Sequence, residues 1–169
     1  MQIVLDDGGR QAAGYRGNAR DCVVRAVAIA TQQPYQVVYD ALSTGSRSER
    51  RSTHNRRRKA SARSGIDTRR KWFKDYLTNL GWVWKPTMHI GSGCYVHLKA
   101  EELPRGHLIV ALSKHYAAVM DGVLYDRTDC TRDGTRCVYG YWYNPRENQG
   151  WERAGVERRE RRRDHQWTG

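Results

Sequence analysis

The residues of this chain that are able to do chemistry together are a cysteine, a histidine and an aspartate that lie far apart in the sequence. Cys22 opens an apolar run, and His115 and Asp126 occupy two short apolar segments much later in the chain. A thiolate is a nucleophile, an imidazole can take the proton of the thiol, and a carboxylate can orient the imidazole ring. Cys22, His115 and Asp126 are therefore the candidate catalytic residues, and they predict cleavage of an acyl bond through a thioester.

A helix is expected to position the thiol. Asp21 is a good N-cap residue, and the apolar residues that follow it recur at helical spacing as far as Ala30. Cys22 then falls in the first turn, where unpaired N–H groups and the helix dipole stabilise an anion. A lone cysteine in an apolar helix is more often a small buried residue. The segment around His115 favours the catalytic interpretation instead.

A β-hairpin is expected to carry the imidazole and the carboxylate. The dipeptide Asp121-Gly122 between two apolar runs predicts a two-residue turn, and this turn places Ala117 opposite Asp126. Because strand side chains alternate between faces, His115 shares a face with Asp126 as its diagonal neighbour, about 7–8 Å away at the backbone. Asp129 falls on the other face by the same count. The alternative is that His115 is an ordinary half-exposed strand residue.

Three segments of the chain resemble a known group of proteins: 21–26 (DCVVRA), 81–84 (GWVW) and 115–129 (HYAAVMDGVLYDRTD). They resemble small phage and prophage proteins that are similar to distant members of the papain-like superfamily. The resemblance covers roughly residues 15–145. It implies a cysteine hydrolase that cleaves an amide, peptide or isopeptide bond of a host or phage protein. Papain-like enzymes commonly carry a Gln about six residues before the nucleophile. This chain has Arg16 there, and Asn18 is the nearest amide for an oxyanion hole.

The apolar patterns predict helices first and an antiparallel sheet afterwards, which is an α+β fold. The resemblance implies that this fold is papain-like, with N-terminal helices packed on a C-terminal antiparallel sheet. The expected helices are 22–31, 35–42 and 69–80, and the expected strands are 106–112, 115–120, 123–126 and 136–143. The domain is expected to span residues 10–145. It brings Cys22 from the helices and His115 from the sheet to one cleft.

The chain is strongly basic, with a formal net charge of +12. The charge is concentrated in a basic insertion at about 44–68 and in a tail at 146–169. Within the insertion, the possible partner-binding patch is Arg56, Arg57, Arg58 and Lys59. Clustered arginine favours nucleic acid or an acidic protein face. The alternative function is therefore a basic nucleic-acid-associated or host-protein-binding phage protein on an inactive hydrolase scaffold.

Several classes of protein are disfavoured by the sequence. No apolar run approaches the ~18 residues of a membrane span and no leader opens the chain, so a cytoplasmic protein without a membrane partner is expected, in the host bacterium if phage-encoded. The glycines at 91 and 93 lack the Lys and Ser/Thr of a phosphate-binding loop. No cofactor is expected, and the oligomeric state is left open.

The cysteines are expected to be reduced, as is usual in a cytosolic protein. A structural zinc site usually contains closely spaced cysteine pairs, and none is present among the candidate ligands Cys94, His97, Cys130 and Cys137. No metal site is therefore expected.

Overall fold

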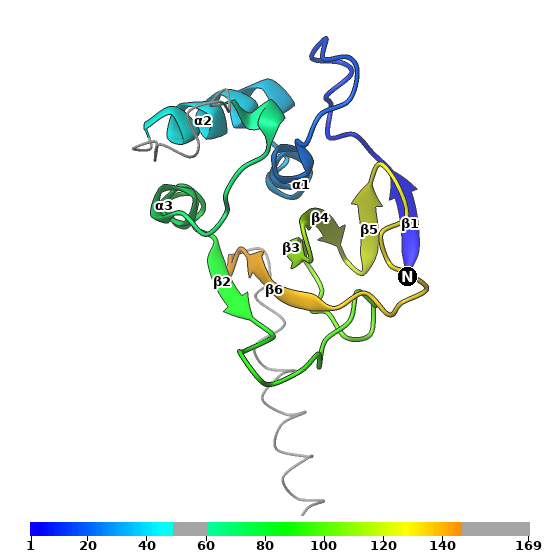
Figure 1. The fold of residues 1–169 in the computed structure, drawn as a ribbon. Coiled ribbons are helices and arrows are strands. Elements are labelled where there is room, and N and C mark those ends of the chain that lie inside the picture. Colours follow the sequence, from blue (N-terminus) through cyan, green and yellow to red (C-terminus); the bar gives the residue numbers. More distant parts are fainter. Residues whose placement is uncertain (49–60, 147–169) are drawn as a thin grey trace, which may run out of the picture.

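The computed structural model describes residues 1–48 and 61–146. In these residues, three α-helices pack on one face of a six-stranded sheet, which is an α+β arrangement (Figure 1). The helices are α1 (Cys22–Thr31), α2 (Tyr35–Ser48) and α3 (Lys71–Asn79), with a short 3-10 turn, η2 (Ala62–Ser64). The strands are β1 (Gln2–Leu5), β2 (Val83–Pro86), β3 (His107–Leu112), β4 (His115–Met120), β5 (Val123–Asp126) and β6 (Val138–Tyr143). Across the described parts of the chain, no helix is long and apolar enough to cross a membrane.

The sheet is mixed and not purely antiparallel as predicted. Its strand order is β1-β5-β4-β3-β6-β2, and β1 pairs in parallel with β5 whereas the other neighbours are antiparallel. The expected start of the domain at residue 10 is therefore wrong, because β1 belongs to the same sheet. A four-residue strand at an edge leaves a weak local pattern, and its parallel pairing depends on residues more than a hundred positions away.

The predicted hairpin between β4 and β5 is confirmed. Val119 pairs with Leu124 and Met120 with Val123, in the predicted register. Asp121 and Gly122 both have positive φ angles, 50° and 83°. Two positive φ values are the signature of the tight turn that matches the twist of paired strands. The residue types of the turn were therefore sufficient to predict the register of β4 and β5.

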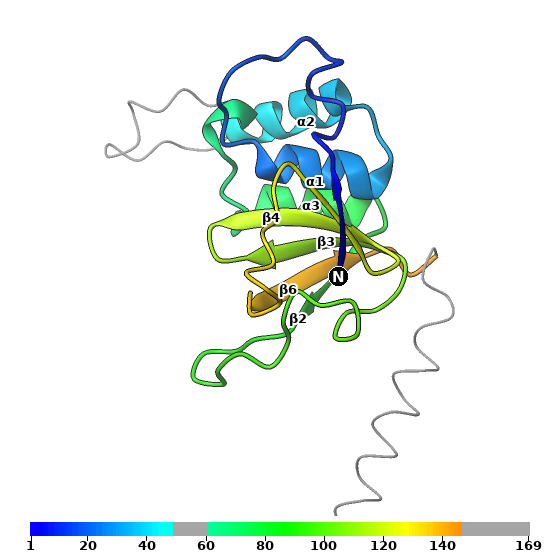
Figure 2. The same cartoon turned by 90° about the vertical axis from the view of Figure 1, so that its right-hand side faces the viewer.

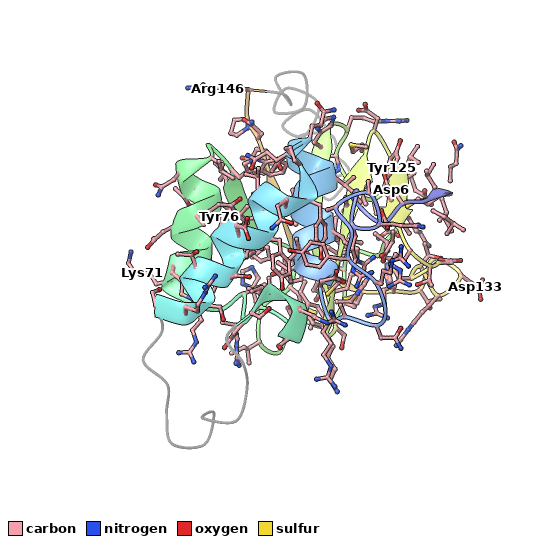
Figure 3. The ribbon with its side chains drawn as sticks, turned by 90° about the horizontal axis from the view of Figure 1, so that it is seen from above. Asp6, Lys71, Tyr76, Tyr125, Asp133 and Arg146 are labelled. Atoms are coloured by element: carbon pink, nitrogen blue, oxygen red, sulfur yellow. A yellow bond between two sulfur atoms is a disulfide. The ribbon has the colours of Figure 1, made fainter. Side chains whose placement is uncertain are left out.

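Helix α1 lies at the centre of the molecule, between the sheet and α2 (Figure 2). The residues from Val23 to Ala30 are all buried, so this short helix is surrounded on every side. Figure 3 looks down on the helical layer and shows α1, α2 and α3 together above one part of the sheet, with Tyr76 on α3 turned toward α2. Phe73 and Leu77 of α3 are fully buried in the core between the helices and the sheet, and Trp72, Tyr76 and Leu80 pack against this core partly buried.

The opposite face of the sheet has a second apolar core. Leu108 and Val110 of β3 and Val119 of β4 are fully buried there. The alternate residues of these strands, such as Ile109 and Ala118, face the helices. Period-two burial on both faces makes the central strands rigid, so the ends of β4 and β5 are fixed supports for any side chains that they carry.

The described borders of the basic insertion are helical. Helix α2 continues to Ser48, beyond its predicted end at residue 42. Ala62 of η2 is fully buried, and its N–H donates to Ser43 Oγ at 3.0 Å. The centre of the insertion and nearly all of the predicted tail, residues 49–60 and 147–169, lie outside the described residues.

The expectation of four reduced cysteines is wrong for one pair. Cys94 and Cys137 form a disulfide, with their Cα atoms 5.9 Å apart. An isolated β-bridge between His97 and Cys137 brings the loop before residue 97 beside the start of β6. This long-range pairing is not visible in the spacing of the cysteines. Cys22 and Cys130 are free thiols.

Candidate active site

Three elements deliver the candidate catalytic residues to one end of the sheet. His115 is the first residue of β4, Asp126 is the last residue of β5, and Cys22 is the first residue of α1. Because β4 and β5 are antiparallel, the start of one lies beside the end of the other. Strand β1 also ends here, where the Asp6 N–H donates to the Asp126 carbonyl at 2.9 Å, and Figure 3 shows Asp6 close to Tyr125 of β5. The chain then passes from β1 over this end of the sheet to α1.

The imidazole and the carboxylate form a direct hydrogen bond. His115 Nε2 lies 2.5 Å from Asp126 Oδ2, and the carboxylate is buried. The predicted proximity of these two residues is therefore confirmed. Asp126 Oδ1 accepts further hydrogen bonds from Arg25 at 2.9 Å and from the Arg127 N–H at 2.7 Å. Burial raises the pKa of Asp126, but these donors, led by His115, lower it overall, so the group is a carboxylate at neutral pH.

The thiol of Cys22 contacts the same imidazole. The Cys22 side chain is half-buried, and its thiol interacts with the imidazole of His115 and with the backbone of Tyr116. Burial raises the pKa of this thiol. The hydrogen bond and charge of His115, the Tyr116 N–H and the charge of Arg25 lower the pKa by more, so the net shift is downward. Thiolate is the nucleophilic form, so these contacts favour the reactive state.

His115 shifts in the opposite direction. Burial lowers the pKa of its imidazole, but hydrogen bonds to Asp126, Cys130 and Cys22 and the charge of Asp126 raise it to about 11. A raised imidazole pKa beside a lowered thiol pKa favours a thiolate–imidazolium pair. These shifts favour a protonated imidazole at neutral pH.

A cluster of buried charged residues lies next to the site and was not predicted from the sequence. Asp21 is fully enclosed, and its carboxylate pairs with Arg10 Nε at 2.8 Å and Arg25 Nε at 3.2 Å and accepts from Tyr35 Oη at 2.6 Å. Its side chain makes no N-cap hydrogen bond, so the predicted capping role is wrong. One signal was available: an Asp and an Arg four residues apart in an apolar helix must pair when both are buried.

Cys130 is a second free thiol beside His115. It lies in the loop after β5, and its thiol is close to the imidazole. The possible ligand atoms of His115, Asp126 and Cys130 lie within 4.8 Å of one another, a set able to hold a metal ion. However, the imidazole is already hydrogen-bonded to the carboxylate at 2.5 Å, and the Arg25 guanidinium lies 2.9 Å from the same carboxylate. This arrangement favours the hydrogen-bonded pair over a bound cation.

The other predicted site residues lie at the border of this region or beyond it. Asn18 has an exposed side chain on the loop before α1, and its carbonyl accepts from Arg63 at 3.4 Å. Its role as an oxyanion donor stays a prediction. The predicted basic patch from Arg56 to Lys59 lies outside the described residues. His97, one of the candidate zinc ligands, has its Nδ1 atom 3.0 Å from Glu102 Oε2 and forms a hydrogen bond there.

No protein-family model, no curated protein and no solved structure matches this chain.

Proposed function

We propose that the protein is a papain-like cysteine hydrolase that cleaves an amide, peptide or isopeptide bond through a thioester at Cys22. The observation that supports this most is the hydrogen bond between the His115 imidazole and the buried Asp126 carboxylate, together with the interaction of the same imidazole with the Cys22 thiol at the start of α1. The lowered thiol pKa and the raised imidazole pKa are consistent with a pair poised to react. Strongly shifted pKa values in a group of interacting side chains are typical of functional sites.

In the proposed reaction, the Cys22 thiolate attacks the carbonyl carbon of the scissile bond and forms a tetrahedral intermediate. His115 then donates its proton to the departing nitrogen, the C–N bond breaks, and the acyl group remains on sulfur as a thioester. Water attacks the thioester while His115 takes up one of its protons. The C–S bond breaks next, which releases the carboxylic acid and restores the thiolate. Asp126 holds the ring and stabilises the imidazolium throughout.

The negative charge on the intermediate requires hydrogen-bond donors near Cys22. Because α1 begins at Cys22, the free N–H groups of its first turn and the positive end of its dipole face the region of the thiol. These backbone groups are the proposed oxyanion donors, with the Asn18 amide as the side-chain candidate. The proposed substrate is a host or phage protein with an accessible extended segment.

The test is turnover of a panel of peptide and isopeptide substrates with fluorogenic leaving groups. We expect Cys22→Ala to abolish turnover and His115→Ala to come close to abolishing it, whereas His89→Ala, on an exposed loop, should resemble the unaltered protein. Intact mass measurement during turnover should show an acyl adduct on Cys22. Full turnover by Cys22→Ala would contradict the proposal.

A further inference from the structure

Arg25 connects the helix that carries the thiol to the strand that carries the carboxylate. It lies one turn after Cys22 on α1 and is 7% exposed. Its Nε lies 3.2 Å from Asp21 Oδ1, and one terminal nitrogen donates to Asp126 Oδ1 at 2.9 Å. A guanidinium is a planar fork of donors, so it can engage two carboxylates at once in a fixed geometry.

The guanidinium is itself held in place. Asp21 is fixed from the other side by Arg10 and Tyr35. The backbone of the loop after β1 also packs closely against Arg25, since a Cβ atom at Gly8 would lie 3.1 Å from the Arg25 Cα. Gly8 has a φ of +66°, a conformation that suits glycine. Arg25 is therefore enclosed by rigid neighbours.

The two carboxylate oxygens of Asp126 have different hydrogen-bond partners. Oδ1 faces Arg25 and the Arg127 N–H, which leaves Oδ2 for His115. Burial opposes ionisation of both Asp126 and Cys22, whereas His115 and, to a smaller degree, the charge of Arg25 favour it. The same guanidinium thus orients the carboxylate and stabilises negative charge on both sides of the imidazole.

We propose that Arg25 is a positioning residue of the site, which holds Asp126 toward His115 and fixes the Cys22 end of α1 against the sheet. This inference rests on the proposed function. Arg25 does not touch the reacting atoms, and it acts through Asp126. The proposal explains why a charged residue occupies the centre of an apolar helix, where burial would otherwise be costly.

The test measures the pH dependence of alkylation at Cys22 by iodoacetamide, with Cys22 and Cys130 resolved by peptide mass spectrometry. For Arg25→Gln we expect alkylation of Cys22 at pH 6–7 to be roughly tenfold slower, the change in thiolate fraction for a midpoint moved by one pH unit. The rates should converge above pH 9. Arg10→Gln is the matched control, because Arg10 is equally buried and shares Asp21 but not Asp126. It should lose stability, and its alkylation profile should move much less than that of Arg25→Gln, because the contact between Arg25 and Asp126 remains.

Arg25→Lys keeps the charge but cannot bridge two carboxylates, so a smaller change of roughly threefold is expected. This variant decides the question if Arg25→Gln does not fold. A profile for the Arg25 variants that superimposes on that of the unaltered protein would overturn the positioning role. If Cys22 of the unaltered protein already reacts like a free thiol, the proposed function fails instead, so the two failures are distinct.

Discussion

Replacement of Asp126 by asparagine removes one negative charge that is shared by several donors. Asp126 is 3% exposed and accepts from His115, Arg25 and the Arg127 N–H. Loss of one partner from a buried charge pair lowers the free energy of unfolding by about 3–5 kcal/mol. The asparagine keeps one oxygen that can accept a hydrogen bond, so we expect a loss at the lower end of this range, about 3 kcal/mol. For a chain of this size, a melting temperature lower by roughly 6–12 °C corresponds to that loss.

The loss should depend on pH with a defined sign. The pKa of Asp126 is lowered from 3.8, so its contribution is present above about pH 4 and disappears as the pH falls through the native value. The pKa of His115 is raised from 6.5 to about 11, so its contribution is complete below pH 6.5 and is lost as the pH rises toward 11. The stability difference between Asp126→Asn and the unaltered protein should therefore be largest between pH 4 and 6.5.

Denaturant unfolding at several pH values measures this difference directly. Asp129→Asn is the control, because Asp129 lies three positions later and accepts local hydrogen bonds from the N–H and the hydroxyl of Thr131. It should leave the free energy of unfolding close to that of the unaltered protein. A difference for Asp126→Asn that is below 1 kcal/mol, or that does not vary with pH, would refute the reasoning.

Three further predictions concern the scaffold and the basic insertion. Replacement of Cys94 and Cys137 by serine should lower the free energy of unfolding by about 4 kcal/mol, as chain entropy predicts for a crosslink spanning 43 residues, and calorimetry measures it. Gly140→Ala should cost about 1–3 kcal/mol in the same assay, because its Cβ would lie 2.3 Å from the Trp84 ring and 2.8 Å from the Lys85 carbonyl oxygen. Alanine at Arg56, Arg57, Arg58 and Lys59 should weaken binding to nucleic acid or an acidic protein, with a reduced salt dependence in fluorescence anisotropy, while Cys22 alkylation stays unchanged. Slower alkylation in that variant would place the insertion at the active site.

The parts of the site that could be predicted from the sequence are those that depend on local chemistry. The Asp121-Gly122 turn set the register that brings His115 to Asp126, because a two-residue turn admits one pairing of its flanking strands. The helix at Cys22 was likewise visible in its apolar spacing. In both cases the signal lies within a dozen residues.

The parts that could not be predicted depend on contacts between distant segments. Arg25 and Asp126 are 101 positions apart in the sequence, and no local pattern around either residue predicts their contact. The Cys94–Cys137 disulfide and the parallel pairing of β1 with β5 also join segments that are far apart in the sequence. Asp21 shows how a correct local preference is overridden: it has the residue type of an N-cap, but two buried arginines bind its carboxylate more strongly.

The most direct test of the central claim is the pH profile of Cys22 alkylation in the full chain, measured beside His115→Ala. The imidazole contact predicts a half-maximal rate for Cys22 below the pH of about 8.5 that is typical of a free thiol. His115→Ala should move that midpoint up to or above the free-thiol value, because burial then acts on the thiol without its imidazolium partner. A Cys22 midpoint at or above 8.5 in the unaltered protein, unchanged by His115→Ala, would contradict an activated nucleophile at this site.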